Sequence, residues 1–368
     1  MKVCVDIQAA VAQRAGVGRY TKALVEHLGP LAGNDELSLF YFDFKGRGDP
    51  FPAPNATRKA LRWCPGMLVQ QAWKRLGWPP FDWFAGRADV YHFPNFIIPP
   101  LARGKAVVTI HDLAFKRFPE TTEQRNLDYL TSQIGKTVAR ADAIIAVSNF
   151  GAREIQELLG VSASRVVAIP SGMARGWAAP PAHSVAATRR ELGIDRPYLL
   201  TVGTLEPRKN IAFLVEVFEG MKFDGDLVIA GGLGWKYEPI LERIRRSPRA
   251  PRIRHLRYVE EQRLAALYAG AELFVFPSLY EGFGFTPLEA MACGVPVLAA
   301  AAGSLPEVLG EAAELAAGYD AADWAARADR LLTDTTRRAE LKERGFRQAR
   351  GFSWDETARK TWQVYRGL

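Results

Sequence analysis

The chain has 368 residues, 48% of them hydrophobic, so it is about twice as long as a typical single-core domain and is expected to form two domains. Its 48 Lys and Arg against 40 Asp and Glu give a net charge of +8, which suits a phosphate-rich ligand or an anionic membrane, and no common nucleic-acid-binding motif is present. The three cysteines have no paired spacing, which excludes a zinc set or a disulfide framework and favours the cytoplasm. No apolar run approaches the roughly 20 residues of a membrane span, and Met1–Ile7 is expected to be a short strand and not a secretory signal.

Strand-like apolar runs alternate with helical segments along the whole chain, which is typical of parallel βαβ architecture. In the first half the expected strands are Val3–Ile7, Leu37–Phe42, Val90–His92, Val107–Ile110, Ala143–Val147 and Val166–Ile169. In the second half they are Tyr198–Val202, Leu227–Ala230, Ile253–Tyr258, Leu273–Phe276 and Val295–Ala299. Small residues and prolines in Ala174–Pro181 indicate a linker between two α/β units.

Gly16 and Gly18 follow the first expected strand and precede a helix. A dinucleotide-binding fingerprint needs a third glycine where Thr21 stands, so this pattern predicts NAD binding only weakly.

Basic and aromatic residues interleave between positions 58 and 84, and the cations among them are Arg58, Lys59, Arg62, Lys74 and Arg75. A basic segment rich in tryptophan is able to lie on an anionic membrane. The same residues also fit the core and a covering helix of the first domain. We favour the second interpretation, because scattered tryptophans are usually mostly buried.

His111 ends the apolar run Ala106–Ile110, which places it at the carboxyl end of an expected strand. A single histidine in such a position is more often a turn residue than a catalytic one. The pattern alone therefore favours a structural role for His111.

Arg208 and Lys209 stand just before a helix that is expected to begin near Asn210. Cations at a helix N-terminus oppose its dipole, at a cost of about 0.3–1 kcal/mol each when exposed. Two of them at that end suggest an anionic partner, and a bound diphosphate would supply one. The alternative is a pair of solvated loop cations.

The segment Glu281–Ala290 is expected to be a loop that opens onto a helix, directly after the buried strand Leu273–Phe276. Thr286 is predicted as the N-cap, Pro287 as the first helical residue and Gly294 as the end of the helix. Such a helix start at the carboxyl edge of a parallel sheet is an anion site. Glu289 also fits a capping box with Thr286, whereas Glu281 has no capping role.

These motifs together resemble those of the family 4 glycosyltransferases, which are retaining enzymes of the GT-B fold. The matching segments are the two glutamates with seven residues between them, Val202–Asn210, Ile110–Asp112 and Phe352–Trp354. The resemblance implies an α/β protein with two facing Rossmann-like domains, residues 1–174 on the acceptor side and 182–352 on the nucleotide-sugar side. It further implies that residues 353–368 form a helix that crosses back to the first domain.

The same resemblance implies catalytic roles for His111 and Glu281. His111 would donate to the departing diphosphate or to a sugar hydroxyl, and Glu281 would hold the donor sugar. The diphosphate would be neutralised by Arg208, by Lys209 and by the backbone N–H groups of Phe283, Gly284, Phe285 and Thr286. Glu289 would hold the ribose hydroxyls.

Three further residues join the nucleotide-sugar site by resemblance: Gly16 and Gly18, in the family's glycine-rich loop, and Val259. Many members carry Asn-Gly-Val-Asp at the domain junction, where this chain has Ser171–Ala174, so no acidic or amide role is expected there. No Asp-x-Asp pair resembles a metal site in the donor loops, so neither a metal nor any other cofactor is expected.

The resemblance implies transfer of a hexose from a nucleotide sugar to a glycan or lipid-linked acceptor, with GDP-mannose as the first choice of donor. That choice follows from the Thr204–Asn210 loop, which looks most like bacterial mannosyltransferases of surface-polysaccharide assembly. A UDP-sugar donor, a sugar-nucleotide epimerase of similar architecture and a non-catalytic binding module remain open. The expected location is the cytoplasm, with peripheral contact to the inner face of the cell membrane as an open possibility.

Overall fold

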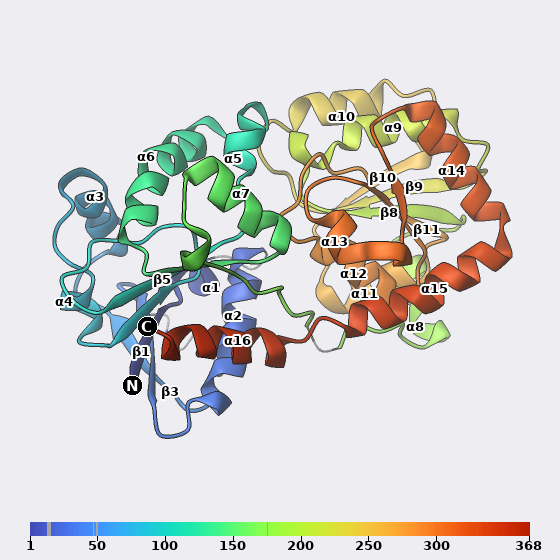
Figure 1. The fold of residues 1–368 in the computed structure, drawn as a ribbon. Helices are drawn as coiled ribbons and strands as arrows, with labels where there is room; N and C mark the ends of the chain where they lie inside the picture. The colour runs from blue at the N-terminus through green and yellow to red at the C-terminus, as the bar shows by residue number, and fades with distance from the viewer. Residues whose placement is uncertain (13–15, 47, 49–50, 175) are drawn as a thin grey trace. The chain divides into compact units, whose positions relative to one another are not determined.

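The computed structural model describes residues 1–12, 16–46, 48, 51–174 and 176–368, and these form two compact units (Figure 1). Unit 1 comprises residues 1–116, 125–172 and 353–368. Unit 2 comprises residues 117–124 and 173–352. Each unit has its own parallel sheet with helices around it, so the expected pair of Rossmann-like α/β domains is confirmed.

Unit 1 is built on a parallel sheet of seven strands in the order β3-β2-β1-β4-β5-β6-β7. The strands are β1 (Lys2–Asp6), β2 (Glu36–Phe42), β3 (Ala56–Leu61), β4 (Val90–Phe93), β5 (Lys105–Ile110), β6 (Ala143–Ala146) and β7 (Val166–Ala168). The helices are α1 (Gln8–Ala12), α2 (Val17–Leu28), α3 (Gly66–Leu76), α4 (Asp82–Ala85), α5 (Ala114–Arg117), α6 (Gln124–Arg140), α7 (Asn149–Leu159) and α16 (Trp354–Arg366). Pairing of Val3 with both Leu37 and Val90 places β1 in the interior of the sheet.

Unit 2 is built on a parallel sheet of six strands in the order β10-β9-β8-β11-β12-β13. The strands are β8 (Tyr198–Val202), β9 (Asp226–Ala230), β10 (Ile253–Arg257), β11 (Leu273–Phe276), β12 (Val297–Ala300) and β13 (Glu314–Ala316). The helices are α8 (Ala182–Glu191), α9 (Ile211–Gly220), α10 (Glu238–Arg245), α11 (Glu261–Ala269), α12 (Phe285–Ala292), α13 (Leu305–Leu309), α14 (Ala321–Thr333) and α15 (Thr335–Arg350). Every residue of β8, β9, β11 and β12 is buried, as expected for a parallel sheet covered on both faces.

The strand order reverses between β8 and β11. From β8 the chain moves outward through β9 to β10, and it then returns to β11 on the other side of β8. The loops that follow β8 and β11 therefore leave the same edge of the sheet side by side. This is the topological switch point, where open α/β sheets bind their ligands.

The C-terminal helix α16 belongs to unit 1, where it packs against α2 (Figure 1, red helix beside blue helix). Ser353 caps it by accepting a hydrogen bond from the N–H of Asp355. The Trp354 ring lies 5.4 Å from that of Tyr20 in α2, and Thr357 Oγ1 donates to the carbonyl of Pro170 over 2.8 Å. No helix among the described residues is long and apolar enough to cross a membrane.

The basic and aromatic segment between residues 58 and 84 divides into two parts. Trp73, Phe81 and Phe84 pack against the core of unit 1, with ring centroids 5.9–6.2 Å apart in the Trp73–Phe81 and Trp73–Phe84 pairs. Trp63 and Trp83, by contrast, are 72% and 63% exposed. The interpretation of the whole segment as core and covering helix is therefore wrong for the exposed tryptophans.

Candidate active site

The loop after β8 carries the two cations that the sequence singled out. Pro207–Lys209 form a single 3-10 turn, and Asn210 adopts a left-handed conformation with φ 55° before α9 begins at Ile211. The Ser278 hydroxyl and the Leu279 N–H, from the loop after β11, both donate to the carbonyl of Arg208. The two loops at the switch point are thereby held together.

Arg208 and Lys209 are paired with carboxylates of unit 2 itself. Lys209 Nζ lies 2.6 Å from Glu281 Oε1, and Arg208 Nη1 lies 3.2 Å from the same oxygen. Arg208 Nη2 also donates to Glu206 Oε1 over 2.6 Å. The two basic side chains are only 17% and 14% exposed, so the interpretation as solvated loop cations is wrong. The anionic partner that these two cations suggested is thus supplied by carboxylates of unit 2, those of Glu281 and Glu206.

Glu281 is buried and strongly ionised in this cluster. Burial raises the pKa of its carboxyl, but the charges of Lys209 and Arg208 and hydrogen bonds from Lys209 and Ser278 outweigh it and set the pKa at about 2. The Ser278 hydroxyl donates to Glu281 Oε1 over 2.6 Å. Two carboxylates and two cations thus meet at the edge where an anionic ligand would bind.

The backbone of Glu281 is fixed from the loop that follows β12. The N–H of Ser304 donates to the carbonyl of Glu281 over 3.0 Å, and its hydroxyl lies within hydrogen-bonding distance of two carbonyl oxygens, 3.0 Å from that of Glu281 and 2.9 Å from that of Phe283. Gly303 allows this approach, because a Cβ there would stand 2.5 Å from Glu281 O. Sequence reasoning missed Ser304 and Ser278, although both follow the carboxyl ends of expected strands.

Helix α12 begins two residues earlier than predicted. Its N-cap is Gly284, with φ 108° and no side-chain cap, so Thr286 is the second helical residue and not the N-cap, and Pro287 is the third. The predicted end is confirmed, since Gly294 has φ 78° directly after the C-cap. The first N–H groups of the helix have no acceptor within it, which leaves a positive helix start at the switch point.

The new helix start removes the capping box from Glu289, because the box requires the N-cap residue three positions earlier. Glu289 is 1% exposed, and its Oε2 accepts a hydrogen bond from Tyr268 over 3.2 Å. Its carboxylate is therefore held inside unit 2 between α11 and α12.

His111 follows β5 in unit 1 and is held between aromatic rings. Its Nε2 lies 2.8 Å from the carbonyl of Pro94, and its ring centroid lies 4.7 Å from that of Tyr20 and 5.7 Å from that of Phe96. Because a carbonyl only accepts, Nε2 carries the proton. Burial lowers the pKa of His111, against the opposing effects of Pro94 and Asp112, so the neutral ring offers Nδ1 as an acceptor. The sequence analysis predicted His111 as a hydrogen-bond donor to the diphosphate or to a sugar hydroxyl, whereas in this tautomer its Nδ1 can only accept.

A second histidine, which the sequence did not single out, lies behind His111. His92 is fully buried in β4, with Nδ1 2.6 Å from the Tyr365 hydroxyl of α16 and Nε2 2.9 Å from Thr109 Oγ1. The Thr109 hydroxyl also lies 3.4 Å from that of Tyr20. Burial, with a smaller effect of His111, lowers the pKa of His92 to about 3. The chain of neutral polar groups links α16 to the surroundings of His111.

Of the glycine pair, Gly16 is the exposed N-cap of α2, and Gly18 is buried in its first turn. Only Gly16 therefore belongs to the loop that was predicted for both, and residues 13–15 of that loop lie outside the described residues. Val259 is partly exposed, just before Glu260, which is the N-cap of α11.

Across the described ranges, no three His, Cys, Asp or Glu side chains gather as a metal site would require.

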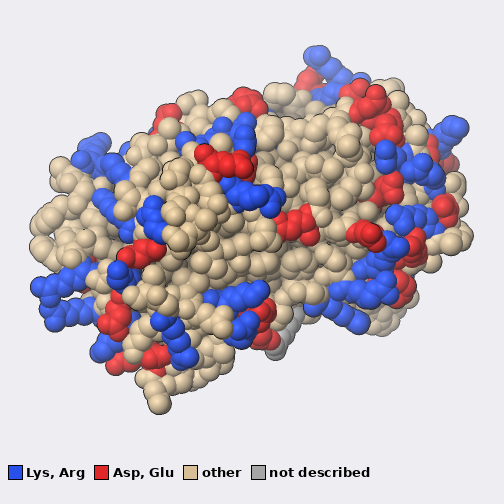
Figure 2. All heavy atoms as spheres, viewed as in Figure 1, with Lys and Arg blue, Asp and Glu red and all other residues tan. Residues whose placement is uncertain are grey.

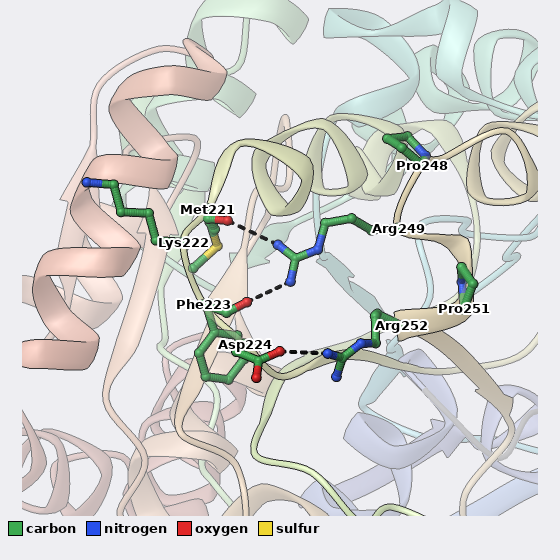
Figure 3. A pocket seen from close by; sticks show the side chains of 8 residues that line it. All are labelled: Met221, Lys222, Phe223, Asp224, Pro248, Arg249, Pro251 and Arg252. Carbon is green, nitrogen blue, oxygen red and sulfur yellow. Dashed lines mark hydrogen bonds and ion pairs between the residues drawn. The ribbon is translucent and has the colours of Figure 1, made fainter.

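A hollow of about 530 Å³ lies at the opposite edge of the unit 2 sheet (Figure 3). The residues that line it precede β9 and β10 and so belong to the amino edge; they are Met221–Asp224, Pro248, Arg249, Pro251 and Arg252. Arg249 spans it, donating to the carbonyls of Phe218, Met221 and Phe223 at the end of α9. The guanidinium is committed to closing a helix terminus, which indicates a structural role.

Comparison with known proteins shows which family the chain resembles. The family described as Glycosyltransferase Family 4 matches residues 14–174, and Glycosyl transferases group 1 matches residues 185–348. The O-antigen chain mannosyltransferase B of Escherichia coli is 31% identical over 372 residues, covering 96% of each chain. A D-inositol 3-phosphate glycosyltransferase of Xylanimonas cellulosilytica is 33% identical over 62% of this chain and 58% of its own. Among solved structures, the sucrose-phosphate synthase from Thermosynechococcus elongatus superimposes with a TM-score of 0.79 at 22% identity, covering 100% of this chain and 99% of its own.

Proposed function

The chain belongs to the family 4 glycosyltransferases, and we propose that it transfers mannose from GDP-mannose, with retention of configuration, to a glycan or lipid-linked acceptor. The observation that carries the proposal is the cluster of Arg208, Lys209 and Glu281 at the topological switch point of unit 2. The choice of mannose is supported by the full-length similarity to the O-antigen mannosyltransferase.

The diphosphate of the donor would replace Glu281 as the partner of Arg208 and Lys209. Arg208 offers a planar fork for phosphate oxygens, Lys209 a compact charge, and the start of α12 its unpaired N–H groups. Stabilising a departing anion with groups already in place is usually the largest catalytic contribution. Glu281 would then hold the donor sugar.

The bond that breaks joins the anomeric carbon to the diphosphate oxygen, and the bond that forms joins the same carbon to the acceptor oxygen. Attack on the face from which the diphosphate departs retains the configuration, and the acceptor proton passes to a phosphate oxygen. The neutral His111 would accept a hydrogen bond from a sugar hydroxyl. Glu289, which is buried, would take the ribose hydroxyls once the donor is bound.

Nucleotide release on incubation with separate sugar nucleotides tests the proposal. Slow formation of GDP from GDP-mannose, faster than nucleotide release from UDP-sugars, is expected of a transferase without its acceptor. Preferential release of UDP would assign a UDP-sugar donor instead. Conversion of the sugar without nucleotide release would indicate an epimerase, and binding without turnover would indicate a binding module.

The product and its metal dependence give a second check. We expect activity to survive excess EDTA and the glycosidic product to keep the anomeric configuration of the donor. Loss of activity on chelation, restored by Mn²⁺ or Mg²⁺, would reveal a metal requirement. An inverted product by NMR would refute the retaining mechanism.

A further inference from the structure

Large apolar side chains are exposed together on one part of unit 1. Among the described residues, six such side chains fall between positions 63 and 83, and each is at least 56% exposed. We call them the α3–α4 patch: Trp63, Met67, Leu68, Leu76, Trp78 and Trp83. The seven other exposed large apolar residues are spread over positions 31–44, 167, 233–258, 319 and 368. This concentration calls for a partner, because soluble proteins rarely expose contiguous apolar surface without a function.

Residues close in sequence to the α3–α4 patch pack against the core of unit 1. Trp73 packs against the core, and its indole N–H donates to the carbonyl of Pro79 over 2.6 Å. The Trp63 ring lies 5.9 Å from that of Phe84, and the Trp78 ring lies 5.4 Å from that of Trp83. Residues of α4 therefore hold two of the exposed tryptophans, because Phe84 contacts Trp63 and Trp83 contacts Trp78.

Cations lie among the apolar side chains and not on an opposite face. Lys74 and Arg75 occupy the last turn of α3. Each stands seven residues after Met67 or Leu68, which places both kinds of side chain on the same side of the helix. The buried side carries Val69. Exposure of apolar and basic groups on one side distinguishes α3 from a covering helix, whose outer face is polar.

Two of the five cations expected to serve a membrane donate hydrogen bonds to backbone carbonyls of unit 1. Arg58 donates to the carbonyl of Phe51 over 2.9 Å, and Lys59 donates to that of Ala85 over 2.8 Å. Arg62 is 63% exposed, although its Nε lies 3.2 Å from Asp43. Lys74 and Arg75 are both exposed next to the patch, and Lys74 Nζ also lies 5.5 Å from the centre of the Tyr129 ring in α6.

We propose that the α3–α4 patch docks onto the surface of an anionic lipid bilayer. Trp63, Trp78 and Trp83 would enter the interfacial layer, which tryptophan favours because its ring is apolar and its N–H needs a polar partner. Lys74 and Arg75 would face the lipid phosphates. Figure 2 shows Lys and Arg above and below a largely uncharged surface at the left of the view, where α3 and α4 lie in Figure 1.

A bilayer fits this surface better than a protein partner does. Trp, Met and Arg are enriched at protein interfaces too, but lysine is depleted there, whereas basic residues that include lysine beside interfacial tryptophans are characteristic of peripheral membrane binding. The net charge of +8 complements a negatively charged membrane. The inference rests on the proposed function, because a lipid-linked acceptor would be presented at such a surface.

Co-sedimentation of the full chain with vesicles tests the inference. We expect binding at low salt to an equal mixture of phosphatidylcholine and phosphatidylglycerol, and much weaker binding to phosphatidylcholine alone. Lys74→Glu with Arg75→Glu should weaken binding by about 20-fold or more, since each cation near the membrane contributes about fivefold. Trp78→Ser with Trp83→Ser should weaken binding to the mixed vesicles as well.

A matched control is available on α15, where Arg347 and Arg350 also occupy the last turn of a helix. Arg347→Glu with Arg350→Glu changes the net charge equally and should weaken vesicle binding much less than the Lys74 and Arg75 substitutions, because neither arginine belongs to the α3–α4 patch. An equal loss in this control would show that overall charge drives binding and would overturn the assignment to the patch. Wild-type protein that stays in the supernatant would overturn it too, and so would self-association through the patch without vesicle binding.

Release of nucleotide from GDP-mannose without lipid separates this inference from the proposed function. The patch variants should keep wild-type release, because none of their residues lies at the switch point of unit 2. Wild-type nucleotide release by a protein that does not bind vesicles would contradict membrane docking by the α3–α4 patch and would not affect the proposed function. Vesicle binding by a protein that turns over no sugar nucleotide would contradict the proposed function. It would also remove the reason to expect a lipid-linked acceptor.

Discussion

The carboxyl edges of the two sheets hold their polar side chains in opposite electrostatic states. At the switch point of unit 2, Lys209 and Arg208 meet Glu281, whose pKa is about 2, in an ion cluster. In unit 1, burial sets the pKa of His92 at about 3 and that of Tyr20 at about 12, so both are neutral at physiological pH. Charge is thus concentrated where a diphosphate is proposed to bind, and uncharged groups stand where sugar hydroxyls would be recognised.

The two edges also differ in how ready they are for a ligand. The cations of unit 2 already have carboxylate partners, so a diphosphate has to exchange with Glu281. His111 is held by the carbonyl of Pro94 and the ring of Tyr20, and neither contact uses its Nδ1. Substitutions in unit 2 should therefore change charge balance and stability together, whereas those in unit 1 should change recognition with little electrostatic effect.

The largest expected effect is that of Glu281→Gln on turnover. The amide keeps the shape but loses the charge that holds the donor sugar, and we expect kcat to fall by about 100-fold or more, the scale of one preorganised polar group. GDP affinity should stay the same or rise, because Lys209 and Arg208 lose a competing anion. Steady-state kinetics and calorimetry on the same preparation measure both.

Glu219→Gln is the matched control for this substitution. Glu219 forms an ion pair with Arg243 at 2.6 Å between α9 and α10 of the same unit. It should lower stability and leave kcat within about twofold, since an ion pair away from the reaction contributes to folding only. Near-wild-type turnover of Glu281→Gln would remove Glu281 from the mechanism.

A smaller loss is expected when His111 is replaced. His111→Gln keeps a neutral acceptor and should reduce kcat by about tenfold, and His111→Phe should reduce it by about 100-fold, in line with the loss of one or more hydrogen bonds. Because the pKa of His111 is lowered from its ordinary value of 6.5, wild-type activity should persist as the pH falls to that value. A kcat that declines as the pH rises from 6 to 7 would instead require a protonated imidazole and contradict the acceptor role.

The smallest expected effect concerns stability in acid. His92 in the unfolded chain binds a proton below its ordinary pKa of 6.5, but in the folded protein only near 3. Acid therefore favours unfolding, by up to about 1.4 kcal/mol per pH unit from this residue. The lowered pKa of His111 also makes the folded protein less stable in acid. The lowered pKa of Glu281 contributes to this loss of stability only below the ordinary glutamate pKa of 4.5.

Urea denaturation between pH 7 and 5 measures this dependence. His92→Gln should flatten it, whereas the same substitution at the exposed His183 should not. An unchanged slope in His92→Gln would show that His92 is not held neutral in the folded protein.

Strong, local patterns in the sequence predicted most of the fold. All eleven expected strands are present, and the buried runs at β8, β9, β11 and β12 agree closely with prediction. The missed strands are β3, whose sequence Ala-Thr-Arg-Lys-Ala-Leu reads as polar, and β13, which has three residues. Both lie at a sheet edge, where partial exposure weakens the apolar signal.

The partners of the site residues could not be read from sequence, because they come from distant positions. Lys209 and Glu281 are 72 positions apart, and His92 and Tyr365 are 273 apart. The start of α12 was misplaced because Thr286 and Pro287 are better N-terminal residues than Gly284, yet a left-handed glycine provides the turn. The exposure of Trp63 and Trp83 was missed because composition does not reveal which side chains of a segment are covered by the rest of the domain.

The account depends most directly on Arg208 and Lys209 as the site of the donor diphosphate. Calorimetric titration with GDP tests it, using Arg208→Ala, Lys209→Ala and, as a control, Arg243→Ala, which breaks the Glu219 pair instead. All three should melt earlier than wild type, because each removes a cation from a largely buried carboxylate. Only the first two should lose GDP affinity, by about 1.5–3 kcal/mol, the scale of charge-assisted hydrogen bonds. Unchanged GDP affinity in folded Arg208→Ala and Lys209→Ala would contradict the account.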